Sequence, residues 1–159
     1  EDSVMAMKIR LELDPFDDIR VVGITTAVMD YQIASYLNKT IHTEFVKREN
    51  IIDEKGGEHS FYIYTKGENS NTFDLVAITS DEGKEWVSFK PKTDYFFIVR
   101  GYMREEVFNQ LLNKIKSIPA VFHAYLVDTG TNKKIYNFLE DVENHEIDVL
   151  DRMKKEGIL

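Results

Sequence analysis

Apolar side chains alternate or run together in eight short segments, which predicts that most of the chain forms β-strands. Strict alternation over 8–13 indicates a strand with one exposed face. Nearly continuous apolar runs over 20–25 and 95–99 indicate strands covered on both faces, and 95–99 is expected at the centre of the sheet. β-Branched and aromatic side chains predict further strands at 43–47, 60–65, 73–79, 86–89 and 121–128.

The apolar period changes to that of a helix in three places. These amphipathic stripes run over 29–41, 103–115 and 135–153. His145 and Glu146 interrupt the last stripe, so we expect a kink or break near Asn144. The whole pattern predicts a single α+β domain with a mostly antiparallel sheet of six to eight strands, two packed helices and a long C-terminal helix.

The expected domain occupies 8–130, and 131–159 forms a helical extension that packs either on this domain or on a partner. Gly23 lies inside the predicted strand 20–25, where it indicates a bulge or the close approach of a neighbour. The N-terminal segment 1–4 differs from a natural start, and Met5 or Met7 is the expected initiator.

Charge and composition exclude several classes of function. Twenty Lys and Arg against 28 Asp and Glu give a net charge of −8, which disfavours binding to nucleic acid or to anionic membranes. The chain has no cysteine, so disulfides, Cys-ligated metals and cysteine nucleophiles are excluded. No segment reaches the roughly 18 apolar residues of a membrane helix, and a cytoplasmic location is expected.

Short motifs give little support for catalysis or metal binding. Asp128-Thr129-Gly130 follows an apolar strand as in aspartic proteases, but the remaining chain is expected to be helical and supplies no second lobe. We therefore interpret it as a turn before a helix. The four histidines show none of the spacings typical of metal ligands, so no metal and no cofactor is expected.

Two stretches, 30–38 preceded by 22–25 and 93–101, resemble the IPExxxVDY family of Bacteroidota proteins, together with the helix that follows and 118–121. The resemblance covers roughly 8–128. The named motif would fall on 87–95, where only Asp94 and Tyr95 match its ending. The chain is identified as a diverged member, and the resemblance implies an origin and a compartment rather than a reaction. Asp30, Tyr31 and Asn38 are predicted to organise the two ends of the first helix. Asp94 is predicted to cap a turn or to pair with Arg100 or Arg104, and the Tyr95 hydroxyl needs a partner if it is buried. The alternative is that these five residues form a binding surface.

Our leading functional hypothesis is a non-enzymatic cytoplasmic module that binds a protein partner or a second copy of itself. The candidate surface is the apolar stripe of the last helix, made of Ile135, Phe138, Leu139 and Val142. Acidic residues concentrated over 140–151 predict a basic partner at the middle of this helix.

Two alternatives stay open. The strand–helix–strand unit over 95–128 resembles half of an ACT-like or ferredoxin-like domain, which would imply small-ligand sensing. An enzyme using Asp94, Asp128 or His123 as acid or base is the other alternative.

Overall fold

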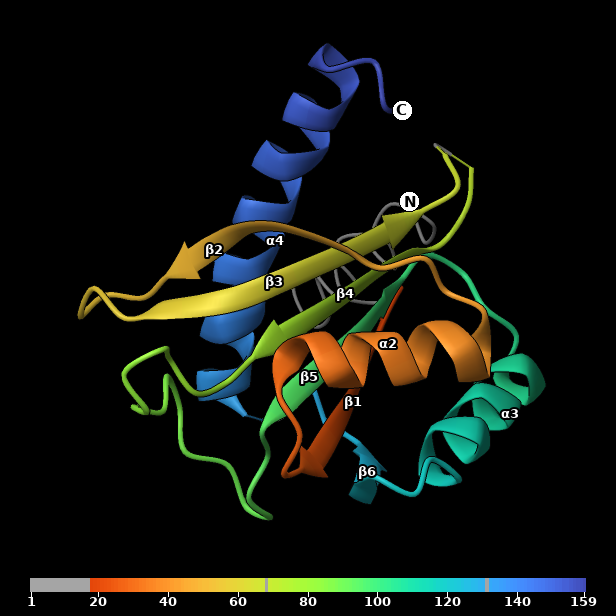
Figure 1. Cartoon of the computed structure of the whole chain (residues 1–159), viewed down its shortest axis with the longest axis vertical. Coiled ribbons are helices and arrows are strands. Elements are labelled where there is room, and N and C mark those ends of the chain that lie inside the picture. The colour runs from red at the N-terminus through yellow and green to blue at the C-terminus, as the bar shows by residue number, and fades with distance from the viewer. Residues whose placement is uncertain (1–17, 68, 131) are drawn as a thin grey trace, which may run out of the picture.

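A computed structural model describes residues 18–67, 69–130 and 132–159 (Figure 1). The predicted strand at 8–13 and the N-terminal segment 1–4 lie outside the described residues.

The described chain forms a six-stranded sheet in the order β2-β3-β4-β5-β1-β6, and every neighbouring pair of strands is antiparallel. The central position predicted for 95–99 is confirmed, because β5 lies between β4 and β1. β5 and β6 both run antiparallel to β1, so they are parallel to each other. The strand bounds are β1 (Ile19–Thr26), β2 (Val46–Ile52), β3 (Glu58–Thr65), β4 (Thr72–Ala77), β5 (Tyr95–Arg100) and β6 (Val121–Leu126).

Three helices among the described residues cover the two faces of this sheet. α2 (Asp30–Ile41) and α3 (Glu105–Lys116) lie on one face, and α4 (Lys133–Lys155) lies behind the sheet on the other (Figure 1). Apolar side chains along each strand alternate between two cores. The predicted α+β domain with two packed helices and a long C-terminal helix is thereby confirmed.

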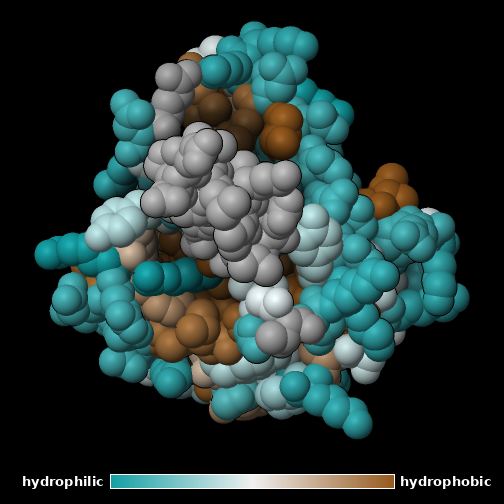
Figure 2. Space-filling model, turned by 180° about the vertical axis from the view of Figure 1, so that it is seen from behind, coloured by the Kyte–Doolittle hydropathy of each residue, from teal (hydrophilic) through white to brown (hydrophobic). Residues whose placement is uncertain are grey.

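The apolar stripe that the sequence offers as a partner-binding surface is part of the protein's own core. It packs against the sheet together with Val149 and Met153. The four predicted residues are all buried: Ile135, Phe138, Leu139 and Val142. The prediction that this stripe meets a partner is therefore corrected, since it has no exposed surface to offer. Seen from behind the sheet, hydrophilic residues form the periphery of the molecule, and apolar patches are visible nearer the centre of the view (Figure 2).

α4 continues for 23 residues without the break predicted near Asn144. The two polar residues that suggested a break both have partners on the sheet. Glu146 Oε2 lies 2.5 Å from Arg100 Nε, and His145 Nε2 donates to the carbonyl oxygen of Glu49 at 2.7 Å. A helix accommodates polar side chains inside its apolar stripe when they meet polar or charged partners on the surface that the helix covers, so this prediction is wrong.

The segment 86–89 does not form the predicted strand. It belongs to an irregular connection between β4 and β5, in which the Trp86 amide donates to the carbonyl oxygen of Ile78 at 2.9 Å. The rings of Trp86 and Phe89 pack against Phe138, with centroids 4.5 and 6.3 Å apart. The aromatic content of this segment therefore reflects burial against α4 and not strand conformation.

Gly23 marks a close approach, as its position in the strand predicted. A Cβ at this position would lie 2.5 Å from Cε1 of Tyr125, its cross-strand neighbour on β6. The Tyr125 hydroxyl is 2.6 Å from Thr93 Oγ1, so a hydrogen bond holds the ring over the glycine.

Substitution of Gly23 by alanine is expected to lower the free energy of unfolding by about 1–3 kcal/mol, because the methyl group overpacks the site. Urea unfolding followed by circular dichroism measures this change. Gly130→Ala is the matched control, since its Cβ would meet only Asp128 Oδ1 at 3.6 Å. Equal losses in the two variants would contradict the close-packing explanation.

Candidate functional site

The five residues of the family resemblance lie around the ends of α2 and the loops next to it. Asn38 Oδ1 accepts hydrogen bonds from the Thr43 hydroxyl at 2.8 Å and from the Phe45 amide at 2.9 Å. These bonds order the turn after α2, so β2 begins at Val46 and not at residue 43 as predicted. Asn38 therefore orders the chain between α2 and β2.

Asp94 and Tyr95 fix the loop between β1 and α2. Asp94 Oδ2 accepts from the Thr26 amide at 3.0 Å, and the Tyr95 hydroxyl donates to the Val28 carbonyl at 3.1 Å. Burial, with the nearby charges of Asp30 and Asp94, raises the pKa of Tyr95 to about 12. The phenol therefore stays protonated at neutral pH and keeps its hydrogen bond.

Asp30 opens α2 and joins it to the sheet. It accepts from the Tyr62 hydroxyl at 3.1 Å and lies 3.4 Å from Lys47 Nζ. Partial burial alone would raise the pKa of Asp30. Hydrogen bonds, including those from the Tyr31 backbone and the Tyr62 hydroxyl, together with Lys47, outweigh this and lower it. Tyr31 is 61% exposed, so of the five it presents the largest side-chain surface to solvent.

A buried acidic pair lies between the sheet and α4. Asp74 of β4 is fully buried and Glu146 of α4 is almost so, and the two carboxyls are hydrogen-bonded to each other. Arg100 of β5 contacts Glu146 and lies 3.8 Å from Asp74. Burial raises the pKa of both carboxyls, and the charge of Glu146 raises that of Asp74 further, well above its ordinary value. The raised pKa favours the protonated form of Asp74, while the contact with Arg100 favours the charged form of Glu146.

Asp74 is expected to make stability fall as pH rises. Its raised pKa means that the folded state retains a proton which the unfolded state loses near the ordinary value of 3.8. Its contribution is fully present below about pH 4 and is lost as pH rises through the folded-state pKa. Asp74→Asn stays neutral, so its unfolding free energy, measured in urea, should increase relative to the wild type from about pH 4 upward.

The exposed acid Asp151, paired with Lys155 at 3.1 Å, supplies the control for this experiment. Asp151→Asn removes an exposed ion pair and should change the free energy of unfolding by less than about 1 kcal/mol. A difference between Asp74→Asn and the wild type that does not change with pH would show that Asp74 titrates alike in the folded and unfolded states.

A second buried polar cluster is centred on His59. Its Nδ1 lies 2.9 Å from the Ala77 carbonyl oxygen, and its Nε2 lies 2.7 Å from Asp53 Oδ2. The Ala77 carbonyl oxygen can only accept, so Nδ1 donates to it, while Nε2 is engaged with the Asp53 carboxylate. The hydrogen bond from His59 is the main reason that the pKa of Asp53 is lowered. Both ring nitrogens therefore have partners within the protein, and the cluster joins β3 to β4 and to the turn after β2.

The two edges of the sheet differ in how they are protected. β2 carries Lys47, Arg48 and Glu49, has a register shift between Arg48 and Ile51, and receives a hydrogen bond from α4 at the Glu49 carbonyl. Charges, bulges and covering elements are the features with which proteins block edge-to-edge pairing. The β2 edge is therefore closed to an added strand.

β6, at the other edge, contains no Asp, Glu, Lys or Arg and pairs only with β1 among the described residues. The Val127 amide donates to Val21 at 2.8 Å, so by alternation the amides and carbonyls of Ala124 and Leu126 point away from β1. Phe122 and Leu126 are 70% and 56% exposed. β6 therefore presents outward backbone groups flanked by apolar side chains.

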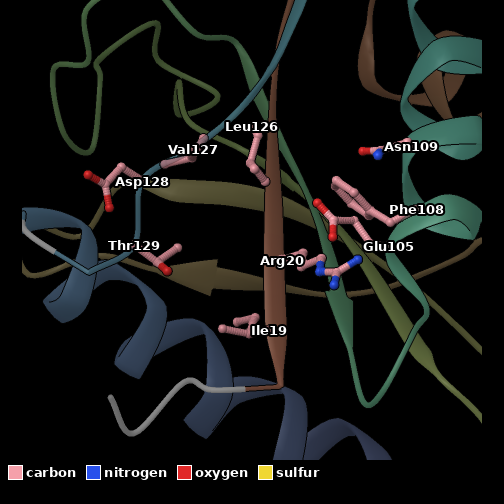
Figure 3. Close-up of a pocket in the computed structure, with 9 residues that line it drawn as sticks. All are labelled: Ile19, Arg20, Glu105, Phe108, Asn109, Leu126, Val127, Asp128 and Thr129. Atoms are coloured by element: carbon pink, nitrogen blue, oxygen red, sulfur yellow. The ribbon is translucent and has the colours of Figure 1, made fainter. Parts of the chain in front are cut away.

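A cavity of about 420 Å³ lies next to the end of β6, where β1 begins and α3 passes over the sheet (Figure 3). Arg20 of β1 projects into it, and its guanidinium lies 4.9 Å above the ring of Phe108 of α3. Nη1 of Arg20 is buried without a hydrogen-bond partner among the described residues. The lining residues are Ile19, Arg20, Glu105, Phe108, Asn109, Leu126, Val127, Asp128 and Thr129.

The candidate acids and bases of the enzyme hypothesis are not gathered in this cavity. Asp128 lines it and also accepts from the Gly130 amide at 3.0 Å, which supports the interpretation of Asp-Thr-Gly as a turn. Asp94 is bound to Thr26, and the ring of His123 stacks on Tyr125 with centroids 5.3 Å apart. None of the five family-motif residues lines the cavity either.

Over the part of the chain that the structure describes, no three His, Asp or Glu side chains are grouped so that they could hold a metal ion. None of the helices in this same part combines the length and the apolar composition needed to cross a bilayer.

Arg20, Asp74 and Arg100 are the polar residues that sequence reasoning missed. Each is a charged residue next to or inside an apolar strand segment. A charge placed in a strand that is covered on both faces must have a partner or lie at a cavity. That signal was present in the sequence, but the identity of each partner depended on the register of the sheet.

No family model matches the chain, and no curated protein matches it. Membership of the IPExxxVDY family therefore stays a prediction from the residues given above.

Proposed function

We propose that the protein is a non-enzymatic protein–protein interaction module that binds an extended segment of a partner along β6. The observation that carries this proposal is the contrast between the two sheet edges, since β2 is charged and covered while β6 is uncharged and exposed. The proposed partner-binding surface is therefore the β6 edge of the sheet, and not the apolar stripe of α4 that the sequence predicted.

Strand addition fits the groups that β6 presents. The outward amides and carbonyls of Ala124 and Leu126 offer four backbone hydrogen bonds to an added strand, and main-chain bonds of this kind supply affinity in strand addition. Phe122 and Leu126 would contact alternate side chains of that strand. The partner segment is therefore expected to be extended and apolar at alternate positions.

Charge favours a foreign partner over a second copy. Each chain carries a net charge of −8, so two copies repel each other, while a neutral or basic partner does not. The middle of α4 exposes three acidic residues, Glu140, Asp141 and Asp148. We therefore still expect that a partner which contacts the middle of this helix is basic there.

The proposal is tested by selecting binders from a displayed library of random short peptides. Selected peptides should protect the amides of Ala124 and Leu126 from hydrogen exchange. Ala124→Pro removes an outward donor without touching the bonds to β1 and should weaken binding by about tenfold or more. Phe122→Ser should also weaken it, whereas Tyr102→Ser, which alters another highly exposed aromatic residue, should not.

Peptides that bind Ala124→Pro and Phe122→Ser as tightly as the wild type, or that leave the β6 amides unprotected, would overturn the proposal. Sedimentation of the protein alone tests whether a second copy of the chain binds at β6. A dimer with protected β6 amides would show that the edge serves a second copy and not a foreign partner.

A further inference from the structure

The cavity beside the end of β6 contains a cation whose charge the described residues leave incompletely satisfied. Arg20 lies on the face of β1 that packs against α2 and α3, where its guanidinium is held over the Phe108 ring. Its Nη1 is buried and makes no hydrogen bond to a described residue. A buried guanidinium nitrogen without an acceptor is costly, so an acceptor from outside the chain would stabilise this site.

The chemistry of Arg20 selects the kind of acceptor. A planar guanidinium matches a carboxylate in bidentate geometry, and the contact with the Phe108 ring holds the guanidinium of Arg20 at the cavity. Next to it, Ile19, Leu126 and Val127 give the cavity an apolar wall. The cavity therefore suits a carboxylate carried on a small apolar body.

Two acidic side chains at the cavity favour a ligand that carries a cationic group beside its carboxylate. Glu105, at the start of α3, and Asp128, after β6, both line the cavity. In the view of Figure 3, Glu105 lies beside Arg20, and Asp128 lies across the cavity from both. A simple anion would be repelled by both carboxylates, whereas a ligand with an ammonium group beside its carboxylate would be attracted by them. A volume of about 420 Å³ lies within the range of small-molecule sites.

We infer that this cavity is a binding site for a free apolar α-amino acid, with its carboxylate on Arg20 and its ammonium group towards Glu105 or Asp128. The apolar side chain of the ligand packs against Leu126 and Val127. This site is distinct from strand addition at β6, because it needs no partner protein and binds a free small molecule.

The test is an NMR titration of the ¹⁵N-labelled protein with L-leucine, L-valine, L-methionine and L-phenylalanine in turn. At least one of them should shift the amides around Arg20, Phe108 and Leu126 at concentrations up to about 10 mM, where even weak binding is detected. L-Leucinamide lacks the carboxylate and 4-methylpentanoate lacks the amine. Each should bind at least about tenfold more weakly than L-leucine.

Variants assign the binding to Arg20. Arg20→Met keeps the length of the side chain and its packing on Phe108 but removes the charge, and it should weaken binding by about tenfold or more. Arg20→Lys keeps the positive charge but loses the paired N–H donors of the guanidinium, so it should also weaken amino-acid binding. Arg152→Met is the matched control, since Arg152 is half exposed on α4, and it should bind as the wild type does.

Three results would overturn the inference. They are the absence of shifts at this cavity with all four amino acids, binding by Arg20→Met that equals the wild type while its spectrum shows an intact fold, and equal binding of L-leucinamide or 4-methylpentanoate. Because the readout is a free ligand on the isolated protein, none of these results bears on whether a peptide adds to β6.

Discussion

Replacement of Arg100 by methionine is expected to lower the free energy of unfolding by about 3–5 kcal/mol, which makes this position one of the most sensitive in the protein. The guanidinium of Arg100 touches Glu146 at 2.5 Å and lies 3.8 Å from Asp74. Its loss leaves two carboxyls buried together without a cation, and the ionised one has no other charge to balance it. Urea unfolding at pH 7 measures the change.

The same experiment contains its own test of mechanism. Arg100→Met combined with Glu146→Leu removes both charges, so it should recover much of the stability that the single variant loses. Arg152→Met, which removes an exposed ion pair with Glu49 at 3.6 Å, should cost less than about 1 kcal/mol. A double variant no more stable than Arg100→Met would mean that packing, and not charge burial, explains the loss.

The sequence predicted the sheet and its helices because each of them follows a regular apolar period. The strand at the centre of the sheet was predictable because 95–99 is apolar on both faces, and β5 is indeed covered on both. Gly23 was predictable as a close approach, since a strand interior otherwise disfavours glycine. These are properties of single elements, and they need no knowledge of which strands are neighbours.

The errors all lie where the outcome depended on contacts between distant segments. Glu146 looked like a break in a helical stripe because its partner Arg100 lies 46 positions earlier, on β5. The aromatic residues at 86–89 looked like a strand because their true partner, Phe138, lies on α4. Periodicity reports which residues are buried, while the pairing that buries them is set by tertiary structure.

The candidate binding surfaces show the same limit. The five family-motif residues could be named as candidates from the sequence. Hydrogen bonds in the structure give four of them a role in ordering the chain around α2. The charge of Arg20 in an apolar strand indicated that it needs a partner or a cavity, but the identity of Phe108 and the place of the cavity depended on how α3 packs over β1. The unprotected edge could be recognised only after the strand order placed β6 at the end of the sheet.

Substitution of Phe138 by alanine is expected to lower the free energy of unfolding by about 3–5 kcal/mol. Its ring is buried, with centroids 4.5 Å from Trp86 and 5.2 Å from Phe96, so truncation opens a cavity between α4 and the sheet. Urea unfolding followed by circular dichroism measures the loss, and tryptophan fluorescence reports the change around Trp86.

This result separates the two roles that the sequence allowed for the apolar stripe of α4. A partner-facing Phe138 would be dispensable for the stability of the isolated protein, and its loss would change only binding. Asn137→Ala, at the exposed neighbouring position of the same helix, is the control and should alter stability by no more than about 0.5 kcal/mol. If Phe138→Ala were as stable as Asn137→Ala, α4 would not close this core, and the stripe would again be a candidate surface for a partner.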